Sequence, residues 1–333
     1  FIMRKNKLPK KLPTGYILLI TATFLWAAAG PVIKNTLEYI PALTFLFLRF
    51  LIVCIVLLPY TIYEIQKVKI HHKDYFNLIL LGIFSQTSLG LIFIGLKYTT
   101  ATDNAIIGIL GSILSVIAGH YFYNDKIHKD LKIGLWLASL GTLIVVIEPL
   151  FSQSQNINIL ERIFGNTLIL IYNFFWVTYI VWSKMSMGER SKILEKTLSF
   201  IKIKPMTKEY PPTLLIAISM FVGLFTIAPL AVFEMMGSFG NSQIFNLSQM
   251  GIEAVTGLLY MALFSSIVAY VSYQKAIKLV KVSDIAFFHY LSPLFTLPVA
   301  YVILGEVPNK FVIVGSVFIA LGVYIAEIKN NKD

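Results

Sequence analysis

The chain has 333 residues, of which 57% are hydrophobic and 14% are charged, and its formal net charge is +11. Soluble globular proteins carry about 25% charged residues, so this composition excludes an ordinary soluble protein and indicates one that lies in lipid. The single cysteine, Cys54, excludes a disulfide framework and a cysteine-rich metal centre.

Ten apolar segments follow one another along the chain. A helix needs about 20 mainly apolar residues to cross the hydrocarbon core of a bilayer. The predicted spans are residues 17–36, 40–62, 75–96, 103–123, 131–149, 163–183, 213–234, 255–275, 283–304 and 311–328. Each span is apolar throughout, whereas a membrane β-strand alternates over about ten residues. The predicted fold class is therefore all-α integral membrane, with ten transmembrane helices.

The basic residues divide unevenly between alternate connections. With the N-terminus in the cytoplasm, the cytoplasmic segments hold 23 of the 28 Lys and Arg, the outside connections hold four, and Arg49 lies inside the second span. Positive charge gathers on the cytoplasmic side of membrane proteins. We therefore predict two cytoplasmic termini and a plasma (cell inner) membrane location, and we interpret the charge as a topology signal, with no nucleic-acid partner.

The chain contains an internal repeat. An offset of 181 residues relates residues 95–147 to the second half, and an offset of 150 residues relates the first spans of the halves. Identical pairs at these offsets include Lys97 with Lys278, Asp103 with Asp284, Gly134 with Gly315, Trp26 with Trp176 and Lys34 with Lys184. Because each repeat has five spans, the repeats must have opposite orientations in the membrane. Inverted repeats are typical of secondary transporters, which hold their substrate between the halves near the bilayer midplane.

The repeat sets the predicted domain boundaries. The segments are a basic cytoplasmic tail at 1–14, the first repeat at 15–149, an outside linker at 150–162, the second repeat at 163–328 and a cytoplasmic tail at 329–333. A polar cytoplasmic loop at 185–212 has no counterpart in the first half and accounts for most of the difference between the offsets. Its charge predicts a mobile segment or a short surface helix.

Several short motifs occur in a fixed order within the two repeats. They are Leu25-Trp26 and Phe175-Trp176, Lys34 and Lys184 eight residues after each Trp, Arg49-Phe50, Gly95-Leu96-Lys97-Tyr98, Ser292-Pro293, and Leu304-Gly305-Glu306. On these residues the chain resembles the drug/metabolite transporter superfamily, specifically its ten-helix EamA-like branch. The departures are Gly111-Ser112, Asn124-Asp125 and the long loop after the sixth span. The resemblance implies transport of small metabolites by alternating access and names no substrate.

Polar and aromatic residues near the middle of the spans are the candidates for substrate binding. They are Trp26, Arg49, Gln86, Asn173, Trp176, Tyr270, His289 and Ser292. Polar side chains avoid the acyl chains, so we expect them to line a central cavity from spans 1, 2, 3, 6, 8 and 9. Burying Arg49 costs at least about 2.5 kcal/mol. Arg49 either clamps a carboxylate or phosphate of the substrate, or it is tied to helix-end carbonyls or to a carboxylate on another helix.

Spans 5 and 10 carry glycines seven residues apart, which fall on one helix face. The pairs are Gly134 with Gly141 and Gly315 with Gly322. Small residues let helices pack closely. We interpret these spans as scaffold that contributes least to the cavity, and alternatively as the surface of a homodimer.

Together these features predict a secondary transporter that moves small organic metabolites, such as amino acids or related amphipathic compounds, by alternating access. One alternative is a sugar-phosphate or nucleotide-sugar exchanger of the same fold, which needs several buried cations; only Arg49 qualifies, with Lys275 and Lys278 at the edge of span 8. A membrane-embedded enzyme needs a clustered nucleophile, acid–base pair or metal set. The sequence contains no such motif, so we expect no catalytic residues, metal or cofactor, and only a small-molecule substrate and the lipid bilayer as further partners.

Overall fold

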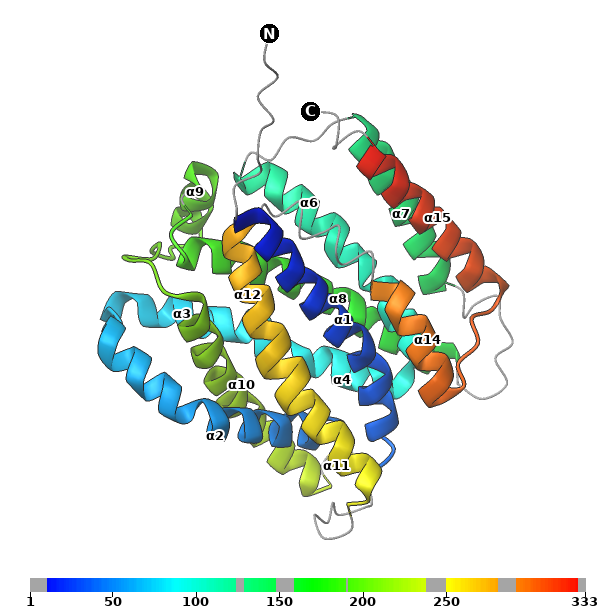
Figure 1. The fold of residues 1–333 in the computed structure, drawn as a ribbon, viewed down its shortest axis with the longest axis horizontal. Coiled ribbons are helices and arrows are strands. Elements are labelled where there is room, and N and C mark those ends of the chain that lie inside the picture. Colours follow the sequence, from blue (N-terminus) through cyan, green and yellow to red (C-terminus); the bar gives the residue numbers. More distant parts are fainter. Residues whose placement is uncertain are drawn as a thin grey trace.

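The computed structural model of the chain describes residues 11–123, 129–147, 159–189, 191–237, 250–280 and 292–328. Every regular element in these ranges is a helix (Figure 1). In the first half these are α1 (Lys11–Thr36), α2 (Ala42–Val68), η1 (His72–Asp74), α3 (Tyr75–Gly82), η2 (Ile83–Thr87), α4 (Leu89–Tyr98), α5 (Ala101–Ile107), α6 (Ile109–Tyr123) and α7 (Lys129–Ile147). In the second half they are α8 (Ile159–Ser186), α9 (Lys192–Phe200), α10 (Pro212–Met235), α11 (Ile252–Leu259), η5 (Tyr260–Val268), α12 (Ala269–Leu279), α14 (Ser292–Leu304) and α15 (Lys310–Ile328). The predicted all-helical class is confirmed.

The helices are apolar enough to lie in a membrane. In the described ranges, seven helical stretches are long and apolar enough to cross a bilayer, and residues 295–304 and 310–322 form shorter apolar helices. Large apolar side chains cover the outside of the molecule, among them Trp136 at 72% exposure and Val302 at 80%. A water-soluble monomer rarely exposes so much apolar surface. The chain is therefore an integral membrane protein.

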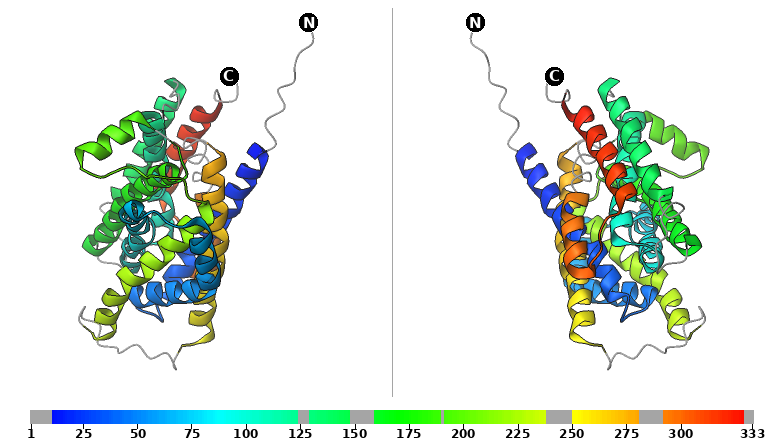
Figure 2. Two further views of the ribbon diagram at one scale, coloured as in Figure 1. Left: turned by 90° about the vertical axis from the view of Figure 1, so that its left-hand side faces the viewer. Right: turned by 90° about the vertical axis from the view of Figure 1, so that its right-hand side faces the viewer.

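The first long helix of each half packs mainly against helices of the other half. In the first half α1 packs against α12 and α14 of the second half, and in the second half α8 packs against α4 and α6 of the first half. Two further pairs, α2 with α10 and α7 with α15, join the halves at other places (Figure 1). The beginning of α1 and the end of α15 lie at the same end of the molecule (Figure 2).

Two lysines bind the C-terminal ends of helices that are equivalent in the two repeats. The Nζ atom of Lys34 donates to the carbonyls of Leu96 and Thr99, and the Nζ atom of Lys184 donates to the carbonyl of Val280. Thr99 and Val280 are the extended residues at which α4 and α12 end, and they are 181 residues apart, as the repeat requires. Carbonyls at a helix C-terminus lack partners within the helix and carry partial negative charge, so a cation stabilises them.

The third apolar segment of each half contains a π-helical stretch. In the first half η2 separates α3 from α4, and in the second half η5 separates α11 from α12. The 181-residue offset places residues 83–87 on residues 264–268, within η5. π-helical turns are rare and occur frequently at functional sites.

The pair α7 and α15 forms a closely packed edge of the molecule. A Cβ atom built at Gly141 would lie 2.4 Å from the carbonyl oxygen of Gly315 and 2.8 Å from the Cγ1 atom of Ile319. Glycine at position 141 therefore allows the two helix backbones to approach each other. The scaffold interpretation of these helices agrees with this contact.

The polar loop at 185–212 folds onto the ends of α2 and α3. The Asp74 carboxylate accepts hydrogen bonds from the backbone and hydroxyl of Thr207, at 2.8 and 2.6 Å, and from the Tyr210 hydroxyl at 2.7 Å. Nearby, the Asn77 amide donates to the carbonyl of Lys204 at 2.8 Å. Burial raises the pKa of Tyr210 to about 12, so its hydroxyl stays protonated near neutral pH. The loop contains the short helix α9 and bonds the second half to the first.

Candidate functional site

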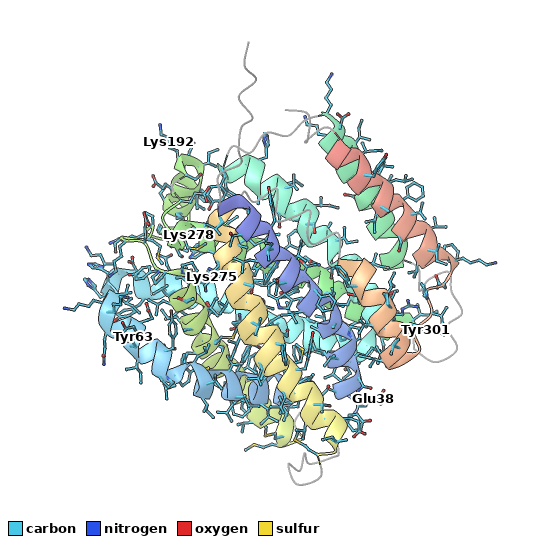
Figure 3. All side chains as sticks on the ribbon, viewed as in Figure 1. Glu38, Tyr63, Lys192, Lys275, Lys278 and Tyr301 are labelled. Carbon is cyan, nitrogen blue, oxygen red and sulfur yellow. The ribbon has the colours of Figure 1, made fainter. Side chains whose placement is uncertain are left out.

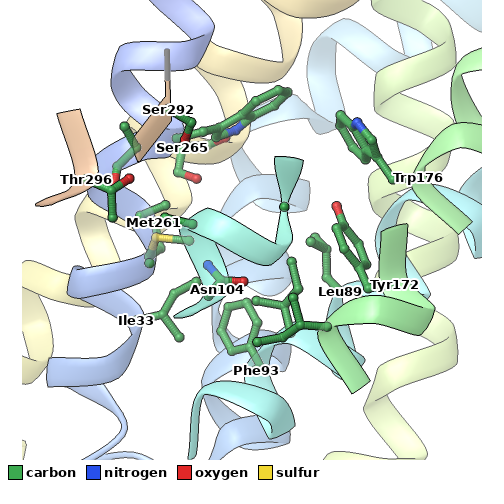
Figure 4. Close-up of a pocket in the computed structure, with 18 of the residues that line it drawn as sticks. Ile33, Leu89, Phe93, Asn104, Tyr172, Trp176, Met261, Ser265, Ser292 and Thr296 are labelled. Carbon is green, nitrogen blue, oxygen red and sulfur yellow. The ribbon is translucent and has the colours of Figure 1, made fainter. Parts of the chain in front are cut away.

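A cavity of about 160 Å³ lies between the two halves (Figure 4). Its walls come from α1, α2, α4, α5, α8, η5, α12 and α14. The lining residues are Trp26, Ala27, Ala29, Gly30, Ile33, Arg49, Leu89, Ile92, Phe93, Asn104, Ala105, Gly108, Ile169, Tyr172, Asn173, Trp176, Met261, Ser265, Tyr270, Ser292 and Thr296. A cavity of about 150 Å³ in a soluble protein can hold benzene, so this one has room for a molecule of similar size.

Most of the residues predicted for the site lie on this cavity. Six of the eight line it, namely Trp26, Arg49, Asn173, Trp176, Tyr270 and Ser292. Gln86 does not line the cavity and is buried beside the Tyr270 side chain. His289 lies outside the described residues. That these residues bind a substrate stays a prediction.

Sequence reasoning missed the contribution of the fourth predicted span. Asn104 and Ala105 of α5 line the cavity, as does Gly108, which follows α5. Asn104 falls near the end of a predicted span, where a polar residue is ordinary, so the sequence carries no signal for it. A signal did exist for Thr296, which lies one helical turn after Ser292 and therefore on the same face. In the described ranges, the cavity has no lining residue from α7, α10 or α15.

Arg49 brings a buried positive charge to the cavity wall. Its residue surface is 2% exposed, and its Nε atom donates to the Oγ atom of Ser266 at 2.6 Å. The guanidinium also lies beside the Tyr270 side chain and 5.8 Å from the ring centres of Phe50 and Phe93. Among the described residues, no carboxylate forms an ion pair with it. A buried charge without an opposite charge is destabilising, so Arg49 is suited to bind an anion.

The π-helical stretch η5 positions this part of the wall. Its Ser265 carbonyl accepts a hydrogen bond from the Trp26 indole at 3.0 Å, and the Tyr260 hydroxyl donates to the carbonyl of Leu25 at 2.7 Å. The next residue, Ser266, accepts the bond from Arg49. The helices α1 and α2 are thus both bonded to η5, which holds Trp26 and Arg49 beside one another.

An aromatic layer closes one end of the cavity. The ring centre of Trp26 lies 5.4 Å from that of Trp176, 4.9 Å from Tyr270 and 4.8 Å from Tyr273. Behind Trp176, the ring centre of Tyr179 lies at 5.1 Å. Edge-to-face and tilted pairs at these distances are favourable. The layer separates the cavity from the end of the molecule where α1 begins.

This aromatic layer is continued by a polar contact between α8 and α12. The Tyr179 hydroxyl donates to the Oε1 atom of Gln274 at 2.6 Å, and the Nε2 atom of Gln274 donates to the Ser183 hydroxyl at 3.1 Å. These groups are buried, and they lie between the rings and the bond from Lys184 to Val280. All of these bonds would have to change before the cavity could open at this end.

A charged layer lies beyond the opposite end of the cavity, next to the lining residue Asn104. The Arg162 guanidinium forms two bonds with the Asp103 carboxylate, at 2.8 and 3.0 Å, and both side chains are buried. The Glu306 carboxylate accepts from the backbone amides of Ala101 and Thr102, each at 2.9 Å, and so caps the N-terminus of α5. Carboxylates stabilise helix N-termini, where four amides lack partners. The first half is therefore bonded to the second at this end as well.

The lining residues are of two chemical kinds, which lie next to one another: the Arg49 guanidinium is 5.8 Å from the ring centre of Phe93. One kind is apolar and includes Leu89, Ile92 and Phe93 of α4. The other kind comprises Arg49 and a set of neutral polar groups, which are Asn104, Tyr172, Asn173, Tyr270, Ser292 and Thr296. None of the described lining residues carries a carboxylate. The cavity is thus complementary to an amphipathic molecule with a negatively charged group.

Comparison with known proteins gives consistent matches. The sequence profile of the EamA-like transporter family matches residues 13–147 and 196–327. An uncharacterized transporter of Archaeoglobus fulgidus is 26% identical over 318 residues, covering 95% of this chain and 98% of the relative. The uncharacterized transporter YyaM of Bacillus subtilis is 24% identical over 315 residues, covering 93% and 92%. A solved crystal structure with 15% identity superposes with a TM-score of 0.63 over 96% of this chain and 98% of its own, and it shows the fold alone.

Proposed function

The chain belongs to the EamA-like transporter family, and on that premise we propose that it is a secondary transporter that moves small organic metabolites through the central cavity by alternating access. One observation carries the proposal: a cavity lies between the halves with a bonded layer at each end, and among the described residues its wall holds one buried guanidinium that forms no ion pair. The candidate binding residues are Trp26, Arg49, Gln86, Asn173, Trp176, Tyr270, His289 and Ser292. We propose transport without catalysis.

We further propose that ten helices cross the membrane as two inverted repeats, at 15–149 and 163–328. This arrangement is supported by the packing of α1 against the second half and of α8 against the first half. The matching bonds of Lys34 and Lys184, and the matching π-helical stretches, support it as well. The distribution of basic residues then favours cytoplasmic termini in a plasma (cell inner) membrane. With this orientation, the aromatic layer faces the cytoplasm and the charged layer faces the outside.

Alternating access follows from the two layers. When the charged layer opens and the aromatic layer stays closed, the cavity is accessible from outside; the reverse arrangement exposes it to the cytoplasm. The charged layer joins α5 to α8, and the aromatic layer joins α1 to α8 and α12, so both layers cross the boundary between the halves. A rocking movement of one half against the other would therefore break one layer while it preserves the other.

The phosphate-exchanger alternative finds less support in the arrangement of the lysines. Lys275 and Lys278 are exposed on α12, outside the cavity (Figure 3). Arg49 is thus the lone cation among the described lining residues, and several phosphate charges need more than one. A homodimer through the outer faces of α7 and α15 stays a prediction, which crosslinking of a cysteine introduced at Leu143 would test.

Reconstitution in proteoliposomes tests the proposed function. A panel of labelled carboxylates, amino acids and sugar phosphates would be offered outside the vesicles. We expect saturable uptake of at least one carboxylate or amino acid, which vesicles without protein do not show. If a folded, monodisperse protein carries no member of the panel in either direction, the proposal is wrong.

A further inference from the structure

We propose that the substrate of the central cavity is a small organic monoanion, with one carboxylate on an apolar body about one ring in size and no ammonium group. This inference rests on the proposed function and narrows it, because it separates simple carboxylates from zwitterionic amino acids. Its three steps concern the charge of Arg49, the charges missing from the wall, and the size of the cavity.

The first step compares the buried cations of the described ranges. There are three, and two of them have carboxylate partners: Arg162 pairs with Asp103 at 2.8 Å, and Lys184 pairs with Glu189 at 2.6 Å. Arg49, the third, forms no ion pair with any residue that the structure describes. The titratable groups nearest to it are the phenols of Tyr172 and Tyr270. Arg49 is therefore the buried cation for which a bound ligand would have to supply the compensating negative charge.

The buried carboxylates of the described ranges are already occupied. Asp103 binds Arg162, and Asp74 binds the backbone and hydroxyl of Thr207. Glu234 binds the backbone amide and the hydroxyl of Thr44 at the start of α2, at 2.7 and 2.8 Å. None of these three groups lines the cavity. A substrate carboxylate would thus supply the charge that these groups do not.

The geometry of Arg49 leaves part of its guanidinium for such a carboxylate. Its Nε atom donates to the Ser266 hydroxyl, and the Tyr270 side chain lies beside it. A guanidinium has five N–H donors in a planar fork, so donors remain for a ligand on the cavity side. Carboxylates are bound well by such a fork, often through both oxygens.

The second step concerns the ammonium group of an amino acid. An α-ammonium group lies next to the carboxylate of the same molecule, and it would therefore enter the cavity close to Arg49. The described wall offers it no carboxylate. A buried ammonium beside a guanidinium is repelled and also loses its hydration, which makes the zwitterion a poorer ligand than the corresponding acid. A second carboxylate on the ligand would likewise lack a cation in this wall.

The third step concerns the body of the ligand. Leu89, Ile92 and Phe93 of α4 present apolar side chains to the cavity, and Ile33 and Met261 add to them beside the polar groups (Figure 4). The volume of about 160 Å³ matches a single ring better than a nucleotide or a disaccharide. Burial of the ring against these side chains would add the apolar part of the affinity.

Three ligands of nearly the same shape test the inference. Phenylacetate carries one negative charge, phenylacetamide is neutral, and phenylglycine adds an ammonium group to the acid. Binding to the purified protein would be measured by the shift of its thermal unfolding and by calorimetric titration. We expect phenylacetate to bind at least tenfold more tightly than the other two. Equal binding of phenylglycine, tighter binding of the amide, or binding of none of the three would overturn the inference.

Variants of Arg49 assign the preference to this residue. In Arg49→Gln the preference for phenylacetate over phenylacetamide should vanish, and in Arg49→Lys it should fall several-fold without disappearing, because the charge remains and the fork is lost. Lys97→Gln, which removes an exposed positive charge outside the cavity, is the matched control and should bind as the unmodified protein does. If Arg49→Gln fails to fold, Tyr270→Phe, which removes a hydroxyl beside the guanidinium, should still weaken phenylacetate binding. Unchanged binding in the folded Arg49 variants, or in Tyr270→Phe, would overturn the assignment.

The outcomes separate this inference from the proposed function. If the protein transports amino acids in proteoliposomes but binds phenylacetate no better than phenylglycine, transport stands and the monoanion assignment is wrong. If it binds phenylacetate through Arg49 but carries no carboxylate across the membrane, the assignment stands and the transporter proposal fails.

Discussion

The third apolar segments of the two halves have the same backbone features and the same lysine contact, which together we call the frame, but they differ in the side chains that line the cavity. Both contain a π-helical stretch, and both end at a residue whose carbonyl binds a lysine of the first helix in the same half. At positions 181 residues apart, however, Leu89 corresponds to Tyr270 and Ile92 corresponds to Tyr273. The contacts that hold the fold are duplicated, whereas the residues near the cavity have diverged. A symmetric frame thus encloses an asymmetric site, to which α4 contributes the apolar Leu89 and α12 contributes the hydroxyl of Tyr270.

The largest effect is expected from the charged layer. In Asp103→Asn, the Arg162 guanidinium stays buried without its carboxylate, which should lower the free energy of unfolding by about 3–5 kcal/mol. Thermal or chemical unfolding in detergent would measure the loss. Glu38→Gln, which removes an exposed carboxylate at the same end, should have little effect. Asp103→Asn combined with Arg162→Leu should recover part of the stability; a loss no larger than that of the control would contradict the structural role of the pair.

The duplicated lysines test whether equivalent contacts have equivalent energies. Lys34→Met and Lys184→Met each remove a donor from the carbonyls at the end of a helix, and each should destabilise the protein by about 1–3 kcal/mol. Unfolding measurements on the two variants should agree to about 1 kcal/mol, because Glu189, the additional partner of Lys184, is 44% exposed and contributes little. Lys278→Met, at an exposed position of α12, serves as the control. If one variant is destabilised and the other is not, the two equivalent lysine contacts do not contribute equally to the free energy of unfolding.

The smallest effect is expected from single groups of the wall. Tyr270→Phe removes a hydroxyl of the cavity wall beside Arg49 and should weaken carboxylate binding by about five- to tenfold, equivalent to about 1 kcal/mol, while the unfolding temperature changes little. The change at the corresponding apolar residue, Leu89→Met, conserves volume and should alter binding by less than about twofold. Calorimetric titration of both variants would compare the two positions. Equal effects would mean that the two kinds of lining residue do not differ as described.

The sequence predicts the fold well because the bilayer imposes a simple rule on it. A span has to be apolar over about 20 residues, and the helical segments in the described ranges follow the predicted spans closely. The family was recognised from Trp26, Trp176 and the lysines that follow them, and the family match confirms it. The number of ten crossings and the inversion of the repeats stay predictions.

The candidate site was less accessible to sequence reasoning. Residues that are unusual in the middle of a span, such as Arg49 and Asn173, were found because lipid offers a polar group no partner. Asn104 was missed because polarity near a span end is common. The bond between Arg49 and Ser266 joins residues 217 positions apart, and no helix pattern indicates it. The π-helical stretches also leave no mark in the hydrophobic pattern, although they place Ser265 and Ser266 against Trp26 and Arg49.

The central claim, that substrates cross between the halves through this cavity, is tested most directly by access to the cavity from each side of the membrane. Ala105→Cys in a Cys54→Ser background places a single thiol on the cavity wall. An impermeant maleimide would be applied to right-side-out and to inside-out vesicles, with Ala22→Cys, at a fully buried position outside the cavity, as the control. The account predicts that Cys at position 105 is labelled from both sides, that a bound carboxylate slows the labelling, and that the control stays unlabelled. Labelling of position 105 from one side only, with and without ligand, would contradict it.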